Sequence, residues 1–502
     1  MFRRKAFVKG LVELYRRCAT ELPEDVSSHL YAALKKEKSV ARFALSEILR
    51  NCEISRKTAL PICQDTGMPI FFVCRPKEVG ERELFAAIKE ATRIATRKVP
   101  LRSNATDALT GKNSGDNTGV MFPLIHFKET DESRIRISLM LKGGGSENIC
   151  AIYKLPDKRI GAERDINGVR LCVLDAVLNA QGRGCPPYLI GVGVGGACDA
   201  TLALAKEQLL LPIDAKNKNR RIRALEKRLL SEINSLGIGP LGLGGKTTAI
   251  SVKIAFAHRH VASYFVAIAF SCWACRRGEM AYDLRNGKIR YKIGNTKKTH
   301  TPVIPVRFKK IKLPPNEEEI KQLRVGDFVS LSGVLYTMRD MAHRYALEND
   351  MREKLGTGYG VYHCGPIMRK TDGNYEVVAA GPTTSARMNR YIPLLIERYG
   401  VRVIIGKGGL GDECADALKK HGAVYLSAIG GAAQTAAAAV KNVEGVFMLE
   451  EFGMAEAIWK LRVDDFRALV TMDSTGASLH KNVEASSRNK FSLLFYEKTT
   501  KI

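Results

Sequence analysis

The 502-residue sequence lacks long hydrophobic runs and is short of acidic residues. No apolar stretch approaches the roughly 20 residues that a membrane-spanning helix needs, so we expect no membrane span. Lys and Arg total 79 against 52 Asp and Glu, a net charge of +27. Such an excess can attract nucleic acid or an anionic substrate. Because the basic residues form no long block and no aromatic–basic RNA-binding signature, we expect charge spread over solvated surfaces and no nucleic-acid partner.

Signatures of secretion and of organelle import are also lacking. The 12 cysteines are scattered through a long chain without a secretory signal, which favours a reducing compartment, and we expect a cytoplasmic location. The basic start, residues 1–5, is followed by Glu13 in the same amphipathic stretch, whereas transit peptides avoid acidic residues. We therefore expect this segment to form the first helix of the fold.

The hydrophobic pattern predicts an α/β protein with more than one domain. Helical spacing covers residues 25–51, 203–210 and 222–234, and apolar strands are expected over 134–141 and 188–194. The later sequence alternates the two patterns, with strands expected over 328–335, 375–380, 401–405 and 423–428 and helices over 337–347, 411–420 and 431–440. Between these two parts the sequence becomes rich in Lys, Arg and Pro, which indicates a linker.

Three glycine-rich segments resemble nucleotide-binding motifs. Residues 406–411 fit GxGxxG between a strand and a helix, so a nicotinamide-dependent dehydrogenase is one alternative. A ribose-binding acid is expected about 20 residues later, but residues 423–427 contain no carboxylate. Residues 191–196 fit the same pattern but lack a full βαβ context. Residues 244–247 resemble the end of a P-loop, but Pro240 occupies the position where a P-loop has its first glycine. We expect glycine in all three to allow close approach of the backbone.

Three of the cysteines stand out by their sequence contexts. Cys63 lies in PICQDTG, Cys185 in GCPPY and Cys272 in SCWAC. They are too far apart in sequence for a local metal-binding loop, so only the whole fold could bring them together. Three thiolates that met in space would hold an iron–sulfur cluster and leave one iron without a protein ligand, and that iron would be a Lewis acid. The alternative is three ordinary buried cysteines.

These contexts and several further motifs resemble a known enzyme family. The cysteine segments together with KGGGSEN at 142–148 resemble the α part of a class I, iron–sulfur-dependent fumarase. YTMRDMAH at 336–343 and GPTTSAR at 381–387 resemble its β part. The resemblance covers nearly the whole chain in order. It indicates a fusion of α and β parts that are separate polypeptides in some members, and it is also close to L-tartrate dehydratase.

The resemblance implies a fumarate hydratase, a hydro-lyase that interconverts fumarate and (S)-malate with an oxygen-sensitive 4Fe–4S cluster on Cys63, Cys185 and Cys272. It implies Thr383 as the base and Asp65 as the acid when malate is converted to fumarate. The residues implied to bind the C4 dicarboxylate substrate are Gln64, Arg102, Gly144, His260, Arg339, Thr384, Arg387 and Lys407. L-tartrate dehydratase and mesaconate hydratase remain alternatives because they share the scaffold and most motifs.

The resemblance also bears on domain organisation and assembly. It implies a larger mixed α/β domain over residues 1–285 that binds the cluster, a basic linker over 286–316, and a smaller swivelling α/β domain over 317–502 that completes the active site. A homodimer and a role in the tricarboxylic acid cycle are expected. Cys275 stands where the family usually carries an acidic residue, and we expect it to be a spectator.

Overall fold

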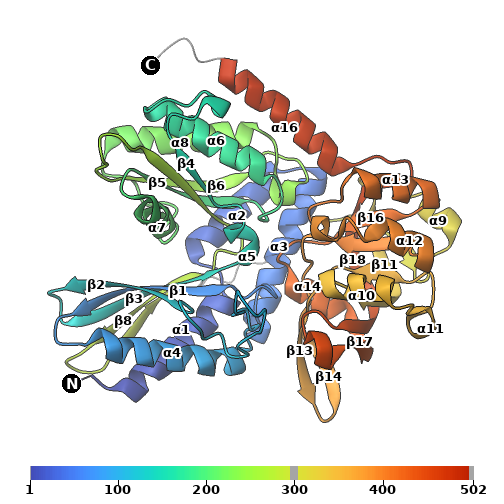
Figure 1. Cartoon of the computed structure of the whole chain (residues 1–502), viewed down its shortest axis with the longest axis horizontal. Coiled ribbons are helices and arrows are strands. Elements are labelled where there is room, and N and C mark those ends of the chain that lie inside the picture. The colour runs from blue at the N-terminus through green and yellow to red at the C-terminus, as the bar shows by residue number, and fades with distance from the viewer. Residues whose placement is uncertain (1, 294–303, 497–502) are drawn as a thin grey trace.

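The computed structural model describes residues 2–293 and 304–496 of a mixed α/β protein, as the hydrophobic pattern predicts. The strands in these two ranges form four sheets, with α-helices packed against the larger ones (Figure 1). Among the described helices, none combines the length and the apolar character that crossing a membrane requires.

The first sheet has the order β2-β1-β3-β8-β9. Its strands are β1 (Met68–Pro76), β2 (Leu124–Thr130), β3 (Arg134–Lys142), β8 (Arg277–Asp283) and β9 (Ile289–Lys292). Helices α1 (Arg4–Thr20) and α4 (Glu81–Lys98) cover one of its faces and share an apolar core with it. Phe7, Leu11 and Leu14 recur at helical spacing and are fully buried. The basic N-terminal segment thus starts a helix of the fold, as expected.

The second sheet has the order β4-β7-β5-β6, and every residue of its strand β5 is buried. Its strands are β4 (Ala151–Lys154), β5 (Tyr188–Val194), β6 (Ala249–Phe256) and β7 (Phe265–Ser271). Helices α6 (Ile166–Ala180) and α8 (Arg220–Ser235) share the core on one face, and α7 (Cys198–Gln208) packs closely against β5. A Cβ atom on Gly193 would lie 2.2 Å from the carbonyl oxygen of Thr201 in α7. The glycines of residues 191–196 therefore allow close backbone approach, as expected.

The third sheet, of order β10-β11-β12-β15-β16-β18-β17, closes on itself because β18 pairs with both β11 and β16. Its strands are β10 (Lys309–Lys312), β11 (Phe328–Thr337), β12 (Gly360–Tyr362), β15 (Val403–Gly406), β16 (Val424–Ser427), β17 (Val440–Phe447) and β18 (Ile458–Met472). The helices around it include α9 (Glu317–Lys321), α10 (Asp340–Glu348), α12 (Ile392–Tyr399), α13 (Asp412–His421) and α14 (Ala433–Ala439). The small fourth sheet is the hairpin of β13 (Ile367–Thr371) and β14 (Asn374–Ala379).

The helical pattern predicted over residues 25–51 is confirmed, with a break that the pattern does not mark. Two helices are found there, α2 (Glu24–Lys36) and α3 (Ser39–Thr58). The chain is extended at Glu37, whose buried carboxylate accepts a hydrogen bond from the backbone N–H of Lys246, with N–O distances of 2.8 and 3.0 Å. This long-range contact ends the first helix, and helical periodicity alone does not reveal it.

The segment expected as a linker, residues 286–316, begins and ends in sheets. Strand β9 pairs with β8 in the first sheet, and β10 pairs with β11 in the third. Residues 294–303 lie outside the described ranges.

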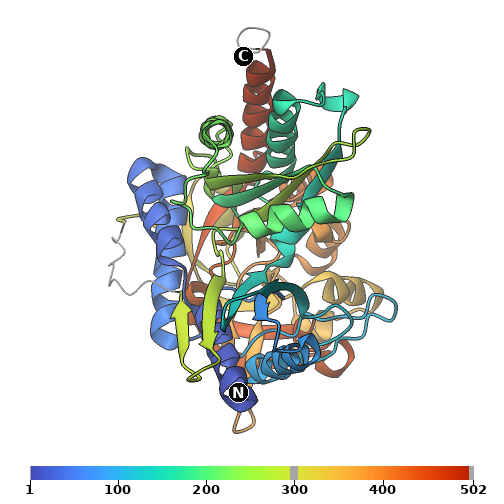
Figure 2. The same cartoon turned by 90° about the vertical axis from the view of Figure 1, so that its left-hand side faces the viewer.

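Helix α16 (Leu479–Tyr496) returns from the C-terminal part of the chain to the N-terminal part and lies beside α6 (Figures 1 and 2). The Gln181 side chain donates a hydrogen bond to the Ser487 hydroxyl at 2.9 Å, and Arg170 donates to the carbonyl oxygen of Leu494 at 3.3 Å. The helix therefore fastens the two parts of the chain to each other.

Candidate active site

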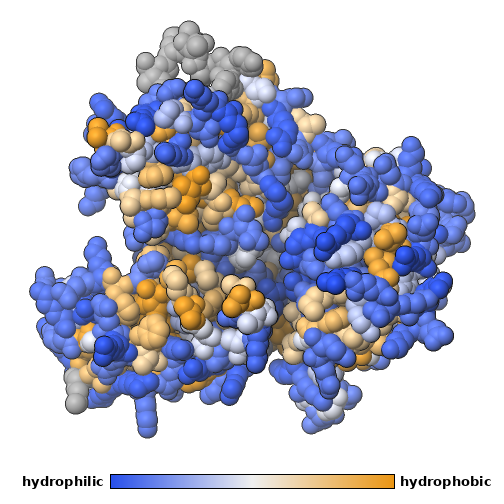
Figure 3. Space-filling model, viewed as in Figure 1, coloured by the Kyte–Doolittle hydropathy of each residue, from blue (hydrophilic) through white to orange (hydrophobic). Residues whose placement is uncertain are grey.

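The conspicuous sequence motifs meet where the N-terminal and C-terminal parts of the chain touch. The Gln64 side chain donates to the carbonyl oxygen of Pro382 at 3.2 Å, and the Trp273 indole donates to that of Gly430 at 2.8 Å. The molecular surface is hollowed between the lobe that carries β1–β3 and the lobe that carries β5 and β6, toward the centre where α5 (Gly144–Glu147) lies (Figures 1 and 3). Loops from both parts of the chain therefore build one site.

Cys63, Cys185 and Cys272 lie around the side chain of Lys407. The Lys407 ammonium donates to the Cys185 thiol at 2.9 Å and interacts electrostatically with Cys63 and Cys272. Burial raises the pKa of Cys272 to about 12, and the thiols of Cys185 and Cys63 add to this rise. Three thiols and a buried cation thus form a single cluster of side chains.

This donor set suits an iron–sulfur cluster better than a single metal ion. In residues 2–293 and 304–496, no three or more His, Cys, Asp and Glu side chains converge tightly enough to hold one ion. A cluster spreads its thiolate ligands over several iron atoms, so its cysteines stand farther apart. Gly430 leaves room beside them, because a Cβ atom there would lie 2.8 Å from the Cys185 sulfur. The residues present therefore fit a cluster.

Asp65 is held beside the thiols by several hydrogen-bond donors. Its carboxylate accepts from the backbone N–H of Gly144 at 2.8 Å and of Gly67 at 3.2 Å, and it pairs with Arg102 at 3.3 Å. Burial raises the pKa of this carboxyl, but Arg102 and Arg276 outweigh it, so the pKa lies below its usual value. Asp65 is therefore a carboxylate in this arrangement and must receive a proton before it can act as an acid.

Thr383 lies against a cation in the C-terminal part. Arg387 donates to the Thr383 hydroxyl oxygen at 3.3 Å and pairs with Asp340 at 3.0 Å. The backbone N–H of Thr383 donates to the carbonyl oxygen of His363 at 2.7 Å, which fixes the loop. The neighbouring Thr384 forms a β-bridge with Lys407. A positive charge beside the hydroxyl favours its deprotonated form.

The three arginines expected to bind carboxylates are close enough to influence one another. Burial lowers the pKa of Arg339, its partner Glu456 raises it, and Arg102 and Arg387 lower it again. Arg339 pairs with Glu456 at 3.0 Å, and both side chains are mostly buried. Guanidinium groups gathered in this way suit two carboxylates of one small diacid.

The comparisons with known proteins agree with this geometry. A family model described as fumarate hydratase (fumerase) matches residues 8–281, and one described as fumarase C-terminus matches residues 278–483. A putative fumarate hydratase class I from Geobacillus stearothermophilus is 42% identical over 503 residues, covering 96% of this chain and 98% of the relative. The chain belongs to the class I fumarate hydratase family. The resemblance read from the motifs is thus confirmed.

In some relatives, the two parts of this chain correspond to separate subunits. The putative L(+)-tartrate dehydratase subunit alpha of Methanocaldococcus jannaschii is 42% identical over 273 residues, covering 53% of this chain and 94% of the relative. Its subunit beta is 41% identical over 183 residues, covering 36% of this chain and 94% of the relative. One chain here therefore spans what that organism carries in two.

Two expected substrate contacts differ in their placement. Gln64 is buried among the clustered residues, and its side chain bonds the loop that carries Thr383. His260 is exposed on the loop between β6 and β7, where its Nδ1 accepts a hydrogen bond from the backbone N–H of Ala262. Within the described ranges, the structure therefore brings Gln64 to the site but not His260.

The sequence reasoning missed three charged residues of the site. Asp340 holds Arg387, Glu456 holds Arg339, and Arg276 donates to the backbone carbonyl oxygen of Asp65. Asp340 directly follows Arg339 in the YTMRDMAH motif, so its position was a usable signal. Glu456 and Arg276 are distant in sequence from the residues they contact, and no local pattern marks them.

The glycine-rich alternatives are explained by packing. A Cβ atom on Gly409 would lie 2.7 Å from the His480 ring, and one on Gly411 would lie 2.7 Å from the Asn389 amide. In the P-loop-like segment, the N–H of Lys246 already binds Glu37. The glycines therefore allow close approach of the backbone, as expected. Lys407, in the segment 406–411, is the residue of these three segments whose side chain contacts a thiol.

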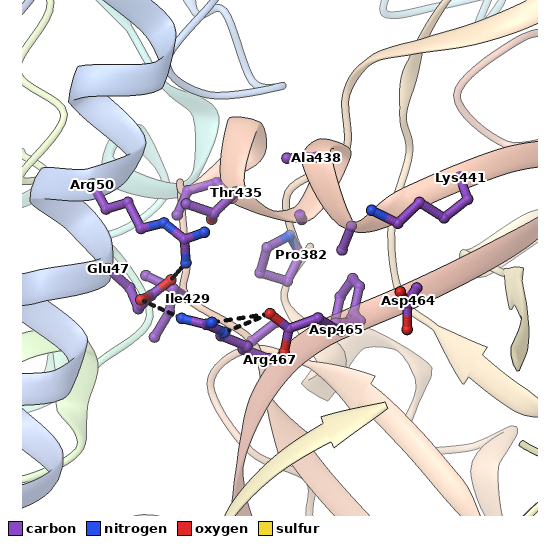
Figure 4. A pocket seen from close by; sticks show the side chains of 15 residues that line it. Glu47, Arg50, Pro382, Ile429, Thr435, Ala438, Lys441, Asp464, Asp465 and Arg467 are labelled. Atoms are coloured by element: carbon purple, nitrogen blue, oxygen red, sulfur yellow. Dashed lines mark hydrogen bonds and ion pairs between the residues drawn. The ribbon is translucent and has the colours of Figure 1, made fainter. Parts of the chain in front are cut away.

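A separate cavity of about 160 Å³ lies behind the loop that carries Thr383 (Figure 4). Pro382 lines it, and Glu47 lies between Arg50 and Arg467, with N–O distances of 3.5 and 3.8 Å. These three charges therefore pair with one another along the cavity wall.

Replacing Glu456 with alanine is expected to raise the KM for malate about tenfold with a smaller effect on kcat. The Arg339 guanidinium would lose the partner that orients it, and a hydrogen bond between charged groups contributes about 1.5–3 kcal/mol. Anaerobic steady-state kinetics measure the two constants. Glu444→Ala is the matched control, because Glu444 pairs with Arg462 and Lys460 and is as buried as Glu456 but lies on β17. An equal rise in both variants would contradict the role of Glu456.

Proposed function

We propose that this protein catalyses the reversible hydration of fumarate to (S)-malate, with a 4Fe–4S cluster bound by Cys63, Cys185 and Cys272. The observations that support this most directly are the three thiols around Lys407 and the group of arginines, which Asp65, two residues from Cys63, joins through its ion pair with Arg102. Cations suit a dicarboxylate, and three thiolates suit a cluster with one iron free of protein ligands. When bound, such a cluster supplies a Lewis acid.

The chain's own residues divide the remaining work. Arg102, Arg339 and Arg387 bind the two carboxylates and fix the orientation of the diacid. In the direction from malate to fumarate, Arg387 stabilises the alkoxide form of Thr383 through its contact at 3.3 Å, and this alkoxide removes the proton from carbon and becomes the neutral hydroxyl. Asp65, once protonated, donates the proton that leaves with the hydroxyl group as water. The backbone N–H of Gly144 holds the Asp65 side chain in place.

The wider substrate shell and the assembly belong to the same proposal. Gln64, Thr384, Lys407 and His260 complete the substrate shell, His260 resting on resemblance alone. The chain consists of a cluster-binding domain over residues 1–285, a linker over 286–316 and a second domain over 317–502. A cytoplasmic homodimer with a role in the tricarboxylic acid cycle is the expected working form.

The test is anaerobic turnover of reconstituted protein with malate, L-tartrate and mesaconate side by side, before and after exposure to air. We expect malate turnover, followed through fumarate absorbance, to be lost in air and restored by iron and reductant. Preference for L-tartrate would favour the second candidate, which the two tartrate dehydratase subunits motivate. Turnover that air leaves unchanged, or none with any diacid despite a complete cluster, would contradict the proposal.

A further inference from the structure

The side chain of Ser385, in the loop that carries Thr383 and Arg387, is buried among polar partners. Its hydroxyl oxygen lies 2.7 Å from Nδ1 of His363 and accepts a hydrogen bond from the Tyr425 hydroxyl at 2.8 Å. All three side chains are fully buried. In the described part of the chain, Nε2 of His363 has no hydrogen-bond partner, so the contact with Ser385 orients this ring. Buried polar side chains that bond one another specify one arrangement of the core.

Backbone hydrogen bonds hold the same loop at the ends of two strands. The N–H of Thr383 donates to the carbonyl oxygen of His363, which follows β12, at 2.7 Å. The N–H of Ser385 donates to the carbonyl oxygen of Lys407, which follows β15, at 3.0 Å. His363 therefore contacts the loop twice, through its carbonyl oxygen at Thr383 and through its ring at Ser385. A shift of Ser385 would also move Thr383, because both residues are held by this one histidine.

Gly406 provides the space for the Ser385 hydroxyl. A Cβ atom on Gly406 would lie 1.9 Å from the Ser385 oxygen, 3.0 Å from the Tyr425 hydroxyl and 3.1 Å from Nδ1 of His363. Gly406 ends β15, which lies between β12 and β16 in the third sheet. Its φ angle is outside the left-handed region, so glycine is needed here for space and not for backbone conformation. The first glycine of the segment 406–411 thus admits the hydroxyl of a residue from the loop of Thr383.

We propose that Ser385 is a positioning residue whose buried hydroxyl, held by His363 and Tyr425, sets the place of the Thr383 hydroxyl beside Arg387. This inference rests on the proposed function, since it names a support for the proposed base. Arg387 donates to the Thr383 oxygen at 3.3 Å. A contact of this length is at the outer end of the range for hydrogen bonds, so a small displacement of the loop is enough to lose it.

The first test uses full-length Ser385→Ala after anaerobic reconstitution, with steady-state kinetics on malate and iron and sulfide measured per chain. We expect kcat to fall about tenfold or more, because misplacing a reacting group by about 1 Å can cost two orders of magnitude in rate. The KM should change much less, because Arg387 keeps its ion pair with Asp340. The iron content should match that of the unmodified protein, because no thiol is changed.

A double-mutant cycle with Thr383→Val separates positioning from general packing. If Ser385 acts through the Thr383 hydroxyl, Ser385→Ala has no further effect on kcat once that hydroxyl is absent. A general packing defect would lower kcat by the same factor in both backgrounds. That second result would overturn the inference.

Two buried tyrosines provide a matched pair of variants. Tyr425→Phe removes the hydroxyl that donates to Ser385 and should lower kcat about fivefold, the effect of one hydrogen bond. Tyr399 is also buried and packs in the same apolar core, but its hydroxyl accepts from the N–H of Met351 and donates to the carbonyl oxygen of Ala346. Tyr399→Phe should lower the unfolding temperature and keep kcat.

The outcomes distinguish this inference from the proposed function. A folded Ser385→Ala variant with the kcat of the unmodified protein would overturn the inference. If that variant does not fold, Tyr425→Phe decides, because equal kcat values for the two phenylalanine variants would overturn the inference as well. Absence of malate turnover by the unmodified protein despite a complete cluster, or full activity of Thr383→Val, would instead contradict the proposed function.

Discussion

Replacing Cys272 with serine is expected to reduce malate dehydration by about a thousandfold or more. Loss of one thiolate would prevent stable assembly of the cluster, and a Lewis-acid metal contributes several kcal/mol to transition-state stabilisation. Each 1.36 kcal/mol corresponds to a factor of ten in rate. The measurement is anaerobic fumarate formation, together with iron and sulfide per chain, so that loss of activity can be assigned to loss of the cluster.

The matched control for this prediction is Cys275→Ala. Cys275 lies three residues later, is 1% exposed and packs in the same apolar cluster as Trp273 and Ala274. The variant should assemble the cluster and turn over malate at a similar rate, with a loss of stability of about 1 kcal/mol from the missing sulfur. Equal loss of iron in both variants would show that Cys275, and not only Cys272, is needed as a ligand.

Replacing Thr383 with valine is expected to lower kcat by about 10²–10⁴, the usual contribution of a positioned general base. Valine keeps the branched shape of the side chain, so the loop held by the backbone bond to His363 should stay in place. The KM should change much less, because the arginines that bind the carboxylates are untouched. Anaerobic steady-state kinetics on protein with a full complement of iron and sulfide give both constants.

The control is Thr383→Ser, which restores the hydroxyl group beside Arg387. We expect it to recover most of kcat, whereas a purely steric role for the threonine methyl group would leave the valine variant active and impair the serine variant. A valine variant with kcat within a few-fold of the unmodified protein would assign the proton transfer to another residue.

The family could be predicted from the sequence because the residues that mark it lie in short contiguous motifs. Cys63, Gln64 and Asp65 are adjacent, and Thr383, Thr384 and Arg387 lie in one loop, so each motif reports on a single piece of backbone. Family membership followed from these motifs and was confirmed. The alternation of strands and helices in the C-terminal part was recovered for the same reason, because hydrophobic periodicity is a local property.

Sequence reasoning failed where a distant contact decides the outcome. Helical spacing over residues 25–51 did not mark the break at Glu37, where the bond from Lys246 separates two helices. At Glu37 the deciding partner lies 209 residues away in the sequence, outside the local pattern. The role of His260 near the substrate stays a prediction from resemblance, and in the structure this residue is exposed on its loop.

By itself, the sequence determined the fold class, the family and the residue types that the chemistry needs. Only the tertiary structure decided which charges meet. The pairing of Arg339 with Glu456, and the hydrogen bond from Arg276 to the backbone of Asp65, join residues distant in the chain. Electrostatic interactions depend on distance in space and on burial, and neither quantity can be read from the order of residues along a chain.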